Sequence, residues 1–302
     1  NLSTGSLVTT GLLAIYSGGD LTIAVPVYET TGYTTLSAAG DITVNQPVTN
    51  TTTGNDLLMT SGGSININSE VGPWDRTTGM FIGRNAVAGG LLTLEAGNSI
   101  NINEDVVSYD APIDLFAGVT TGGADNCVSP PCTVTLADTK QVRAGSGSIS
   151  VTSYSDLTNG PAPGGVNDAI TTGYLTTGTL NLTSTTGDLT IQQTIPDTTG
   201  EVTLQGGNSV VINQRIYSNN SDISIFGGAG GVIFNSDNDP ESDFLLNTYK
   251  VSDVDLGLGD LWIEAVGDIR PDILSKEFVV RSGGVLTLKS TSGTVSHVNI
   301  AN

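Results

Sequence analysis

The sequence predicts an all-β protein built as a β-solenoid, in which one strand–turn–strand unit is repeated and stacked upon itself. Three observations predict this fold. One short motif recurs along the chain, its copies are spaced about 21–23 residues apart, and the apolar residues within each copy alternate with polar ones. Alternation is the period of a strand with one buried face, whereas a helical repeat needs apolar residues three and four positions apart.

The motif is a glycine, then Asp, Ser or Asn, then apolar-x-apolar-Asn. A third apolar residue follows four positions after the second apolar residue of this pattern. From Leu21 to Ile42 is 21 residues, and from Ile42 to Ile65 is 23. This spacing is that of one rung of a β-solenoid. The clearest copies begin at Gly40, Gly63, Gly97 and Gly207, and weaker ones at Gly19, Gly187 and Gly231.

Each rung is expected to run strand, Gly-rich corner, strand, short corner and third short strand. Glycine suits corners that need a positive φ, Thr, Val and Ile fill the strands, and aromatic residues are only 5% of the chain, as a narrow interior requires. The first strand of each rung is expected at residues 57–59, 92–94, 180–182, 202–204, 223–225, 261–263 and 286–288.

The motif continues from about residue 12 to about residue 295 with no break in composition. We therefore expect a single elongated β-solenoid domain over residues 1–302. Longer intervals, of 35 residues from Ile65 to Ile100 and 49 from Ile100 to Ile149, indicate that the excess residues leave the solenoid as loops or add partial rungs. Loop insertions are expected near 72–89, 119–132, 153–174 and 235–258, and loops on a rigid scaffold are where function is usually found.

Two polar columns accompany the repeat. The asparagines that follow the apolar pairs are expected to stack as an amide ladder, although Asn also serves simply as a turn residue. Asp20 and Asp41 occupy equivalent corner positions, where Ser64 interrupts the carboxylates, so solvated acids are expected there and no cofactor. The expected ladder residues are Asn45, Asn68, Asn103, Asn213 and Asn235. The weak calcium candidates are Asp237, Asp239, Glu241 and Asp243.

Charge limits the partners. The chain has 30 acidic and 10 basic residues, a net charge of −20, and charged residues make up only 13% of it. Such a chain repels nucleic acid. A surface of Thr, Ser, Asn and Gly suits an exported protein. The sequence has no apolar run long enough to span a bilayer and no signal peptide, and its start at Asn1 implies processing or a fragment.

The two cysteines, Cys127 and Cys132, lie five positions apart with two prolines between them. A disulfide in an oxidising compartment is expected, with free loop thiols as the alternative. A zinc site is not expected, because two cysteines and the single histidine, His297, do not supply four zinc ligands.

Aromatic residues near the expected loops are candidates for glycan contact, although they also serve to cover the solenoid. They are Trp74, Tyr109, Tyr154 and Tyr174.

Catalysis by a solenoid requires grouped carboxylates on one face. Glu70, Glu104 and Asp105 are candidates, but Pro47 and Arg215 stand at equivalent positions in other rungs, so no acidic face extends along the chain. We expect that the protein is not an enzyme.

The segment 91–106, with the units at 57–71, 178–195 and 200–216, resembles the repeat of the filamentous haemagglutinin family, the exoproteins of bacterial two-partner secretion. The resemblance implies a right-handed parallel β-helix on the cell surface or in the extracellular space. It also implies adhesion, surface filaments or presentation of a distal effector. Expected partners are host or neighbouring cell surfaces, glycans, or like subunits joined end to end. The family's Asn-Pro-Asn-Gly secretion motif is missing, so the chain resembles a shaft section or a fibre subunit. The alternatives are a polysaccharide lyase or hydrolase, and a stalk that presents a toxin or receptor-binding tip.

Overall fold

The fold is that of a computed structural model of the 302-residue chain. The residues it describes are 2–3, 7–8, 11–28, 32–49, 56–69, 71, 74–75, 80–81, 90–108, 111–137, 142–144, 147–159, 178–192, 195–198, 200–213, 216–218, 221–234, 254–255, 259–271, 278–281 and 284–300.

The described residues form strands and turns, with no helix among them. The strands of residues 2–144 are β1 (Leu2–Ser3), β2 (Leu7–Val8), β3 (Leu13–Ser17), β4 (Leu21–Ile23), β5 (Val27–Tyr28), β6 (Thr34–Ala38), β7 (Ile42–Val44), β8 (Leu57–Ser61), β9 (Ile65–Ile67), β10 (Trp74–Asp75), β11 (Met80–Phe81), β12 (Leu92–Ala96), β13 (Ile100–Ile102), β14 (Val106–Val107), β15 (Ile113–Ala117), β16 (Val134–Leu136) and β17 (Val142–Arg143).

Those that follow are β18 (Ile149–Ser153), β19 (Leu157–Asn159), β20 (Leu180–Ser184), β21 (Leu189–Ile191), β22 (Ile195–Thr198), β23 (Val202–Gly206), β24 (Ser209–Ile212), β25 (Ile216–Ser218), β26 (Ile223–Gly227), β27 (Gly231–Phe234), β28 (Val254–Asp255), β29 (Leu261–Ala265), β30 (Ile269–Pro271), β31 (Phe278–Arg281), β32 (Leu286–Ser290) and β33 (Val298–Ile300).

The chain divides into two compact units, which are described separately. Unit 1 comprises residues 1–155 and 168–170, and unit 2 comprises residues 156–167 and 171–302. The expectation of one continuous domain over 1–302 stays a prediction.

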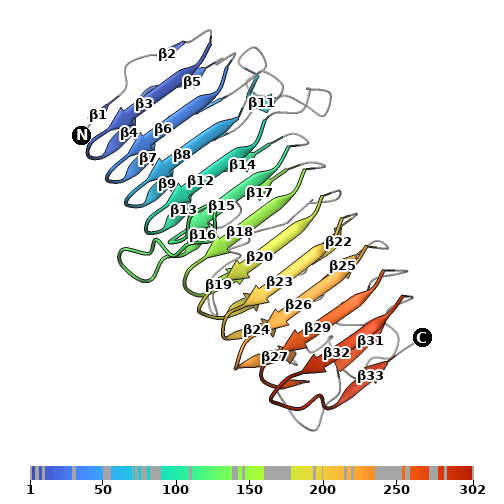
Figure 1. Cartoon of the computed structure of the whole chain (residues 1–302). Coiled ribbons are helices and arrows are strands. Elements are labelled where there is room, and N and C mark those ends of the chain that lie inside the picture. The colour runs from blue at the N-terminus through green and yellow to red at the C-terminus, as the bar shows by residue number, and fades with distance from the viewer. Residues whose placement is uncertain are drawn as a thin grey trace. The chain divides into compact units, whose positions relative to one another are not determined.

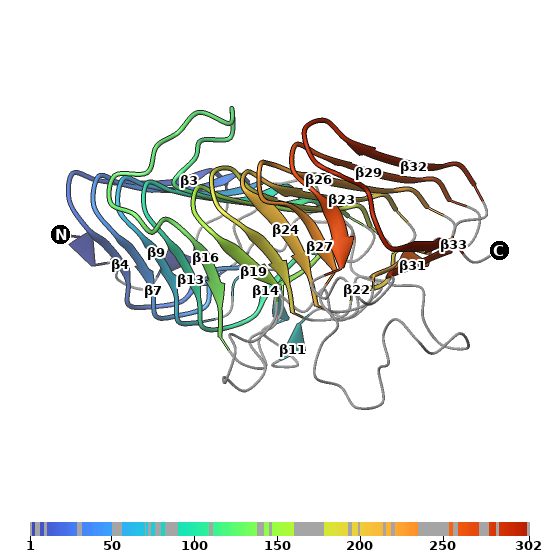
Figure 2. The same ribbon diagram turned by 90° about the horizontal axis from the view of Figure 1, so that it is seen from below.

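In unit 1, five-residue strands pair in parallel in the order β3-β6-β8-β12-β15-β18 (Figure 1). Three-residue strands, preceded by the two-residue β1, form a second parallel sheet in the order β1-β4-β7-β9-β13-β16; β4, β7, β9, β13 and β16 are seen side by side in Figure 2. A third edge joins Val27, Val48, Val71 and Val106 by successive parallel bridges and continues from β14 to β17. These valines include the residues expected four positions after the apolar pair.

Unit 2 repeats this plan. Its five-residue strands run in the order β20-β23-β26-β29-β32, its second sheet in the order β19-β21-β24-β27-β30, and its third in the order β22-β25-β28-β31-β33. Each turn of the chain thus contributes one strand to each of three parallel sheets. The fold is the predicted right-handed parallel β-helix.

The apolar columns explain the packing. Ile42 lies opposite Ile65 and Ile65 opposite Ile100, and all three side chains are fully buried. The residue between each apolar pair is only partly buried, as at Thr43 and Asn66. This alternation is the one that the sequence predicts for strands with one face inward.

The interval of 49 residues from Ile100 to Ile149 is expected to hold a loop or partial rungs added between two copies of the motif, but these two residues do not occupy equivalent positions. Ile100 pairs with Val134, whereas Ile149 pairs with Ile113 in the long-strand sheet. A complete rung formed by β15, β16 and β17 lies in that interval. The error arises because strands of both sheets show the same alternation, so spacing alone does not tell them apart.

Candidate functional site

An amide ladder crosses three rungs of unit 1. Asn68 Nδ2 donates to Asn45 Oδ1 at 3.0 Å, and Asn103 Nδ2 donates to Asn68 Oδ1 at 2.8 Å. Of the other expected members, Asn213 is 5% exposed in unit 2 and Asn235 lies outside the described residues. Asn68 both donates and accepts, so it is the central member of the ladder.

A second ladder was not expected. Asn101 Nδ2 donates to Asn66 Oδ1 at 2.9 Å, and Thr135 Oγ1 donates to Asn101 Oδ1 at 2.8 Å. These side chains stand on the outer face of β9, β13 and β16. The signal for it in the sequence is the middle residue of each apolar-x-apolar triplet, which is Asn in two successive rungs.

Corner side chains also join successive rungs by accepting hydrogen bonds from the backbone. Asp20 Oδ1 accepts from the Asp41 N–H at 3.1 Å, and Asp41 Oδ1 accepts from the Ser64 N–H at 2.8 Å. Ser64 Oγ then accepts from the Ser99 N–H at 3.4 Å, and Ser99 Oγ from the Thr133 N–H at 3.3 Å. Ser64 therefore interrupts the column of carboxylates, as expected, while its hydroxyl group continues the column of hydrogen-bond acceptors.

The same arrangement recurs at other corners of both units. In each case the Oδ1 atom of an aspartate accepts from a backbone N–H of the next rung, at 2.7–3.1 Å. The pairs are Asp56 with Leu91, Asp156 with Asp188, Asp188 with Ser209, Asp222 with Asp260, Asp260 with Val285, and Asp268 with Thr294. Much of the acidity of the described repeats therefore serves the stacking of rungs.

The corner glycines make room for these carboxylates. A Cβ on Gly40 would collide with Asp20 Oδ1, and one on Gly63 would collide with Asp41 Oδ1. Neither glycine has a positive φ, which is found among the described glycines at Gly11, Gly118, Gly123 and Gly231. The prediction that corner glycines supply positive φ is therefore wrong at Gly40 and Gly63, where close approach between rungs is the requirement.

Within the described ranges, no three His, Cys, Asp or Glu side chains are grouped so as to hold a metal ion. The weak calcium candidates lie outside those ranges. They are Asp237, Asp239, Glu241 and Asp243.

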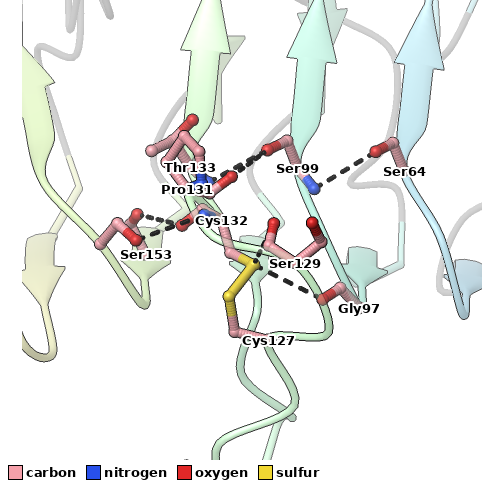
Figure 3. The surroundings of a disulfide bond; sticks show 10 residues. Ser64, Gly97, Ser99, Cys127, Ser129, Pro131, Cys132, Thr133 and Ser153 are labelled. Carbon is pink, nitrogen blue, oxygen red and sulfur yellow. Dashed lines mark hydrogen bonds between the residues drawn. A yellow bond between two sulfur atoms is a disulfide. The ribbon is translucent and has the colours of Figure 1, made fainter.

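The loop at 119–132 leaves unit 1 between β15 and β16 and carries the disulfide (Figure 3). Cys127 and Cys132 are joined with an S–S distance of 2.02 Å, and Cys132 is fully buried. Ser153 Oγ donates to the Cys132 carbonyl at 2.8 Å, and Ser99 Oγ donates to the Pro131 carbonyl at 3.1 Å. These bonds hold the returning chain between neighbouring rungs, while residues 121–126 of the loop are exposed.

The aromatic candidates are only partly described. Trp74 lies in β10, which pairs antiparallel with β11 within 72–89, and the side chain of Trp74 is not among the described ones. Tyr109 and Tyr174 are also outside it, whereas Tyr154 is half-buried after β18. Of the segment 153–174, residues 153–159 are described and include β19, and of 235–258 only β28 is described. The described contacts do not bring these aromatic residues together.

A groove on the outer face of unit 2 was not expected from the sequence. It has a volume of about 500 Å³ and is lined by parts of β26, β29 and β32, by the residue before each of these strands, and by Glu201, which precedes β23. Its side chains include Phe226, Trp262, Thr287, Asp222 and Asp260. Trp262 is 42% exposed. In the register of the sheet, Trp262 lies between Ser224 and Thr287, both small, so the ring stands above its neighbours.

Two polar contacts support Trp262. Its Nε1 donates to Glu264 Oε2 at 3.2 Å, and Lys289 Nζ forms an ion pair with Glu264 Oε1 at 2.6 Å. The hydrogen bond from Lys289, with its positive charge and the bond from Trp262, holds the pKa of Glu264 below its ordinary value. Glu264 is therefore ionised at neutral pH, which does not suit the role of a general acid.

The catalytic candidates found from the sequence remain separate from this groove. Glu104 and Asp105 are half-buried in unit 1 after β13, and Glu70 lies outside the described residues. Burial raises the pKa of Asp114, which stands on the outer face of β15 between Thr93 and Ser150 in the register. No second carboxylate stands at either of those two positions.

Comparison with known proteins gives no match to a family model, a curated protein or a solved structure. No helix in the part of the chain that the structure describes is long and apolar enough to cross a membrane.

Proposed function

We propose that the chain is a non-catalytic extracellular scaffold with an adhesive role, of the kind found in filamentous haemagglutinin-like surface proteins. The observation that carries this proposal is the use made of the polar side chains in the repeats. The corner aspartates and serines accept backbone hydrogen bonds from the next rung, and the asparagines bond to each other. These groups stack the rungs in register. A rigid stack of this kind suits a scaffold that presents its binding surfaces at fixed positions.

The disulfide bond supports the same proposal, of which export is a part. The disulfide between Cys127 and Cys132 suits an oxidising compartment. Surface attachment in bacteria, contact with glycans or a neighbouring cell, and end-to-end assembly with like subunits are parts of this proposal. The last of these would use the unpaired backbone groups at the edge of a terminal rung.

The proposal is tested by adhesion and by electron microscopy. Purified protein is expected to bind a cell surface or a glycan-coated surface, and binding is expected to depend on the inserted segments 72–89 and 153–174. Closing either segment with a short Gly-Ser turn should leave the β-rich circular dichroism spectrum nearly unchanged, because loop length has a weak effect on stability. Adhesion that is unchanged by both deletions would contradict the role of the loops. Electron micrographs of native material would separate fibres from single subunits.

The alternative is a polysaccharide-active enzyme, and the observation that favours it is the groove of unit 2, with Glu201, Asp222, Asp260 and Glu264 along it. It predicts release of sugar fragments from a soluble polysaccharide. Loss of that release in Glu264→Gln would place the activity in the groove, and loss in Glu104→Gln would place it in unit 1. Reproducible turnover by the wild-type protein would overturn the non-catalytic proposal.

A further inference from the structure

The groove over β26, β29 and β32 contains the features of a built binding site. Its volume of about 500 Å³ falls within the range of about 300–1,000 Å³ usual for small-ligand sites. Phe226 and Trp262 supply aromatic surface on one sheet face, and Ser224 and Thr287 supply hydroxyl groups beside the indole ring.

The indole ring of Trp262 is held in place before any ligand arrives. Glu264 accepts the Nε1 hydrogen bond of the ring, and Lys289 holds the other oxygen of the same carboxylate. A ring fixed in this way loses little conformational freedom on binding, which favours affinity. Its exposed face offers a flat apolar surface against which the C–H face of a sugar ring can pack.

The charge of the groove selects among sugars. Four carboxylates line it, from Glu201, Asp222, Asp260 and Glu264, and Lys289, beside the groove, is paired with Glu264. Asp222 and Asp260 each use Oδ1 to accept a backbone N–H, at 2.9 and 2.7 Å, which leaves Oδ2 to receive a hydrogen bond from a ligand. With a net charge of −20 on the whole chain, anionic sugars are repelled and cationic ones attracted.

We infer that this groove binds an oligosaccharide that carries amine-bearing sugar units, with one sugar ring packed on Trp262 and its ammonium group beside Asp222 and Asp260. An ammonium group near an indole face gains a cation–π attraction as well as charge pairing. This binding is independent of adhesion by the loops, because the groove belongs to the repeats of unit 2.

The test uses Trp262 itself as the probe. The chain has two tryptophans, so Trp74→Phe leaves Trp262 as the only indole and its fluorescence reports on the groove. This protein is titrated with a glucosamine hexamer at mildly acidic pH, with its N-acetylated hexamer and with a galacturonate hexamer. We expect a saturable change in emission with glucosamine that weakens with added salt, weaker binding of the N-acetylated sugar and none of the uronate.

Matched variants separate the contribution of the indole ring to sugar binding from that of the carboxylate charges. Binding is measured by calorimetry. Trp262→Ala should weaken binding of the glucosamine hexamer about ten-fold, whereas Tyr16→Ala, which removes an exposed aromatic ring in unit 1, should not. Asp222→Asn and Asp260→Asn keep the Oδ1 acceptor for the backbone while removing the charge. They should weaken binding of the glucosamine hexamer and leave binding of the N-acetylated one unchanged.

The inference is overturned if none of the sugars gives saturable binding, if Trp262→Ala binds as tightly as the wild type, or if the N-acetylated or uronate sugar binds at least as tightly as glucosamine. Capture of a peptide or protein in the groove, with no sugar binding, would also overturn it. Loss of adhesion in the loop deletions with intact sugar binding would leave the groove assignment in place, so the two proposals fail separately.

Discussion

Replacement of Asn68 by Ala should destabilise unit 1 more than replacement of either neighbour in the same amide ladder. Asn68 donates to Asn45 at 3.0 Å and accepts from Asn103 at 2.8 Å, so its loss removes two hydrogen bonds between rungs. Asn103→Ala removes one. Because these amides are exposed, we assign each hydrogen bond a contribution of about 0.5–1 kcal/mol to the free energy of unfolding, the lower part of the usual range.

The expected loss of unfolding free energy is therefore about 1–2 kcal/mol for Asn68→Ala and about half of that for Asn103→Ala. The first value corresponds to a fall in melting temperature of a few °C, on the order of 2–4 °C for each kcal/mol. Because stacked repeats can unfold in parts, denaturation is best paired with hydrogen exchange at the Asn68 and Asn103 backbone N–H groups.

Asn126→Ala is the matched control, because Asn126 is an exposed amide in the loop at 119–132 and is not a member of the ladder. It should be almost silent. The double variant at Asn68 and Asn103 should lose less than the sum of the single losses, because both single changes remove the same bond. Equal effects at Asn68 and Asn126, or strictly additive losses, would refute the ladder as a source of stability.

Two further predictions concern the core and pH. Ile102→Asp places a carboxylate at a position that is 1% exposed and should cost several kcal/mol, whereas Asn101→Asp, on the outer face of the same strand, should cost far less. Near-wild-type melting of Ile102→Asp would show that the assumed register is wrong. The backbone and hydroxyl hydrogen bonds from Thr294, with the charge of Arg270, hold the pKa of Asp268 below its ordinary value. The stability that Asp268 contributes is thus present above its unfolded pKa and lost as pH falls through the lower folded pKa. In Thr294→Val the pKa of Asp268, followed by NMR, should rise, and an unchanged pKa would contradict the assigned cause.

Part of the candidate site followed from the sequence and part did not. The stacking of Asn45, Asn68 and Asn103 was predictable, because they occupy the same place in rungs whose alternation fixes the register. The sequence predicts solvated acids at the corners, because it does not show which backbone N–H lies beside Asp41. The groove around Trp262 was not predicted. The expected first strands at 223–225 and 261–263 place Ser224 beside Trp262, but the order of residues does not show that Asp222 and Asp260 line the same groove as the indole ring.

The sequence by itself determined the class of fold, because an alternating apolar period repeated about every 21–23 residues can bury its apolar face in every rung only by stacking. It also determined which side chains face inward, since the period of a strand is two. The tertiary structure alone decided the partners between rungs wherever inserted segments change the spacing. Thr133 thus follows Ser99 in the corner column, and Val134 follows Ile100 in the core. It also decided that Gly63 gives room to Asp41, because contacts between adjacent rungs depend on distances in space that the order of residues does not encode.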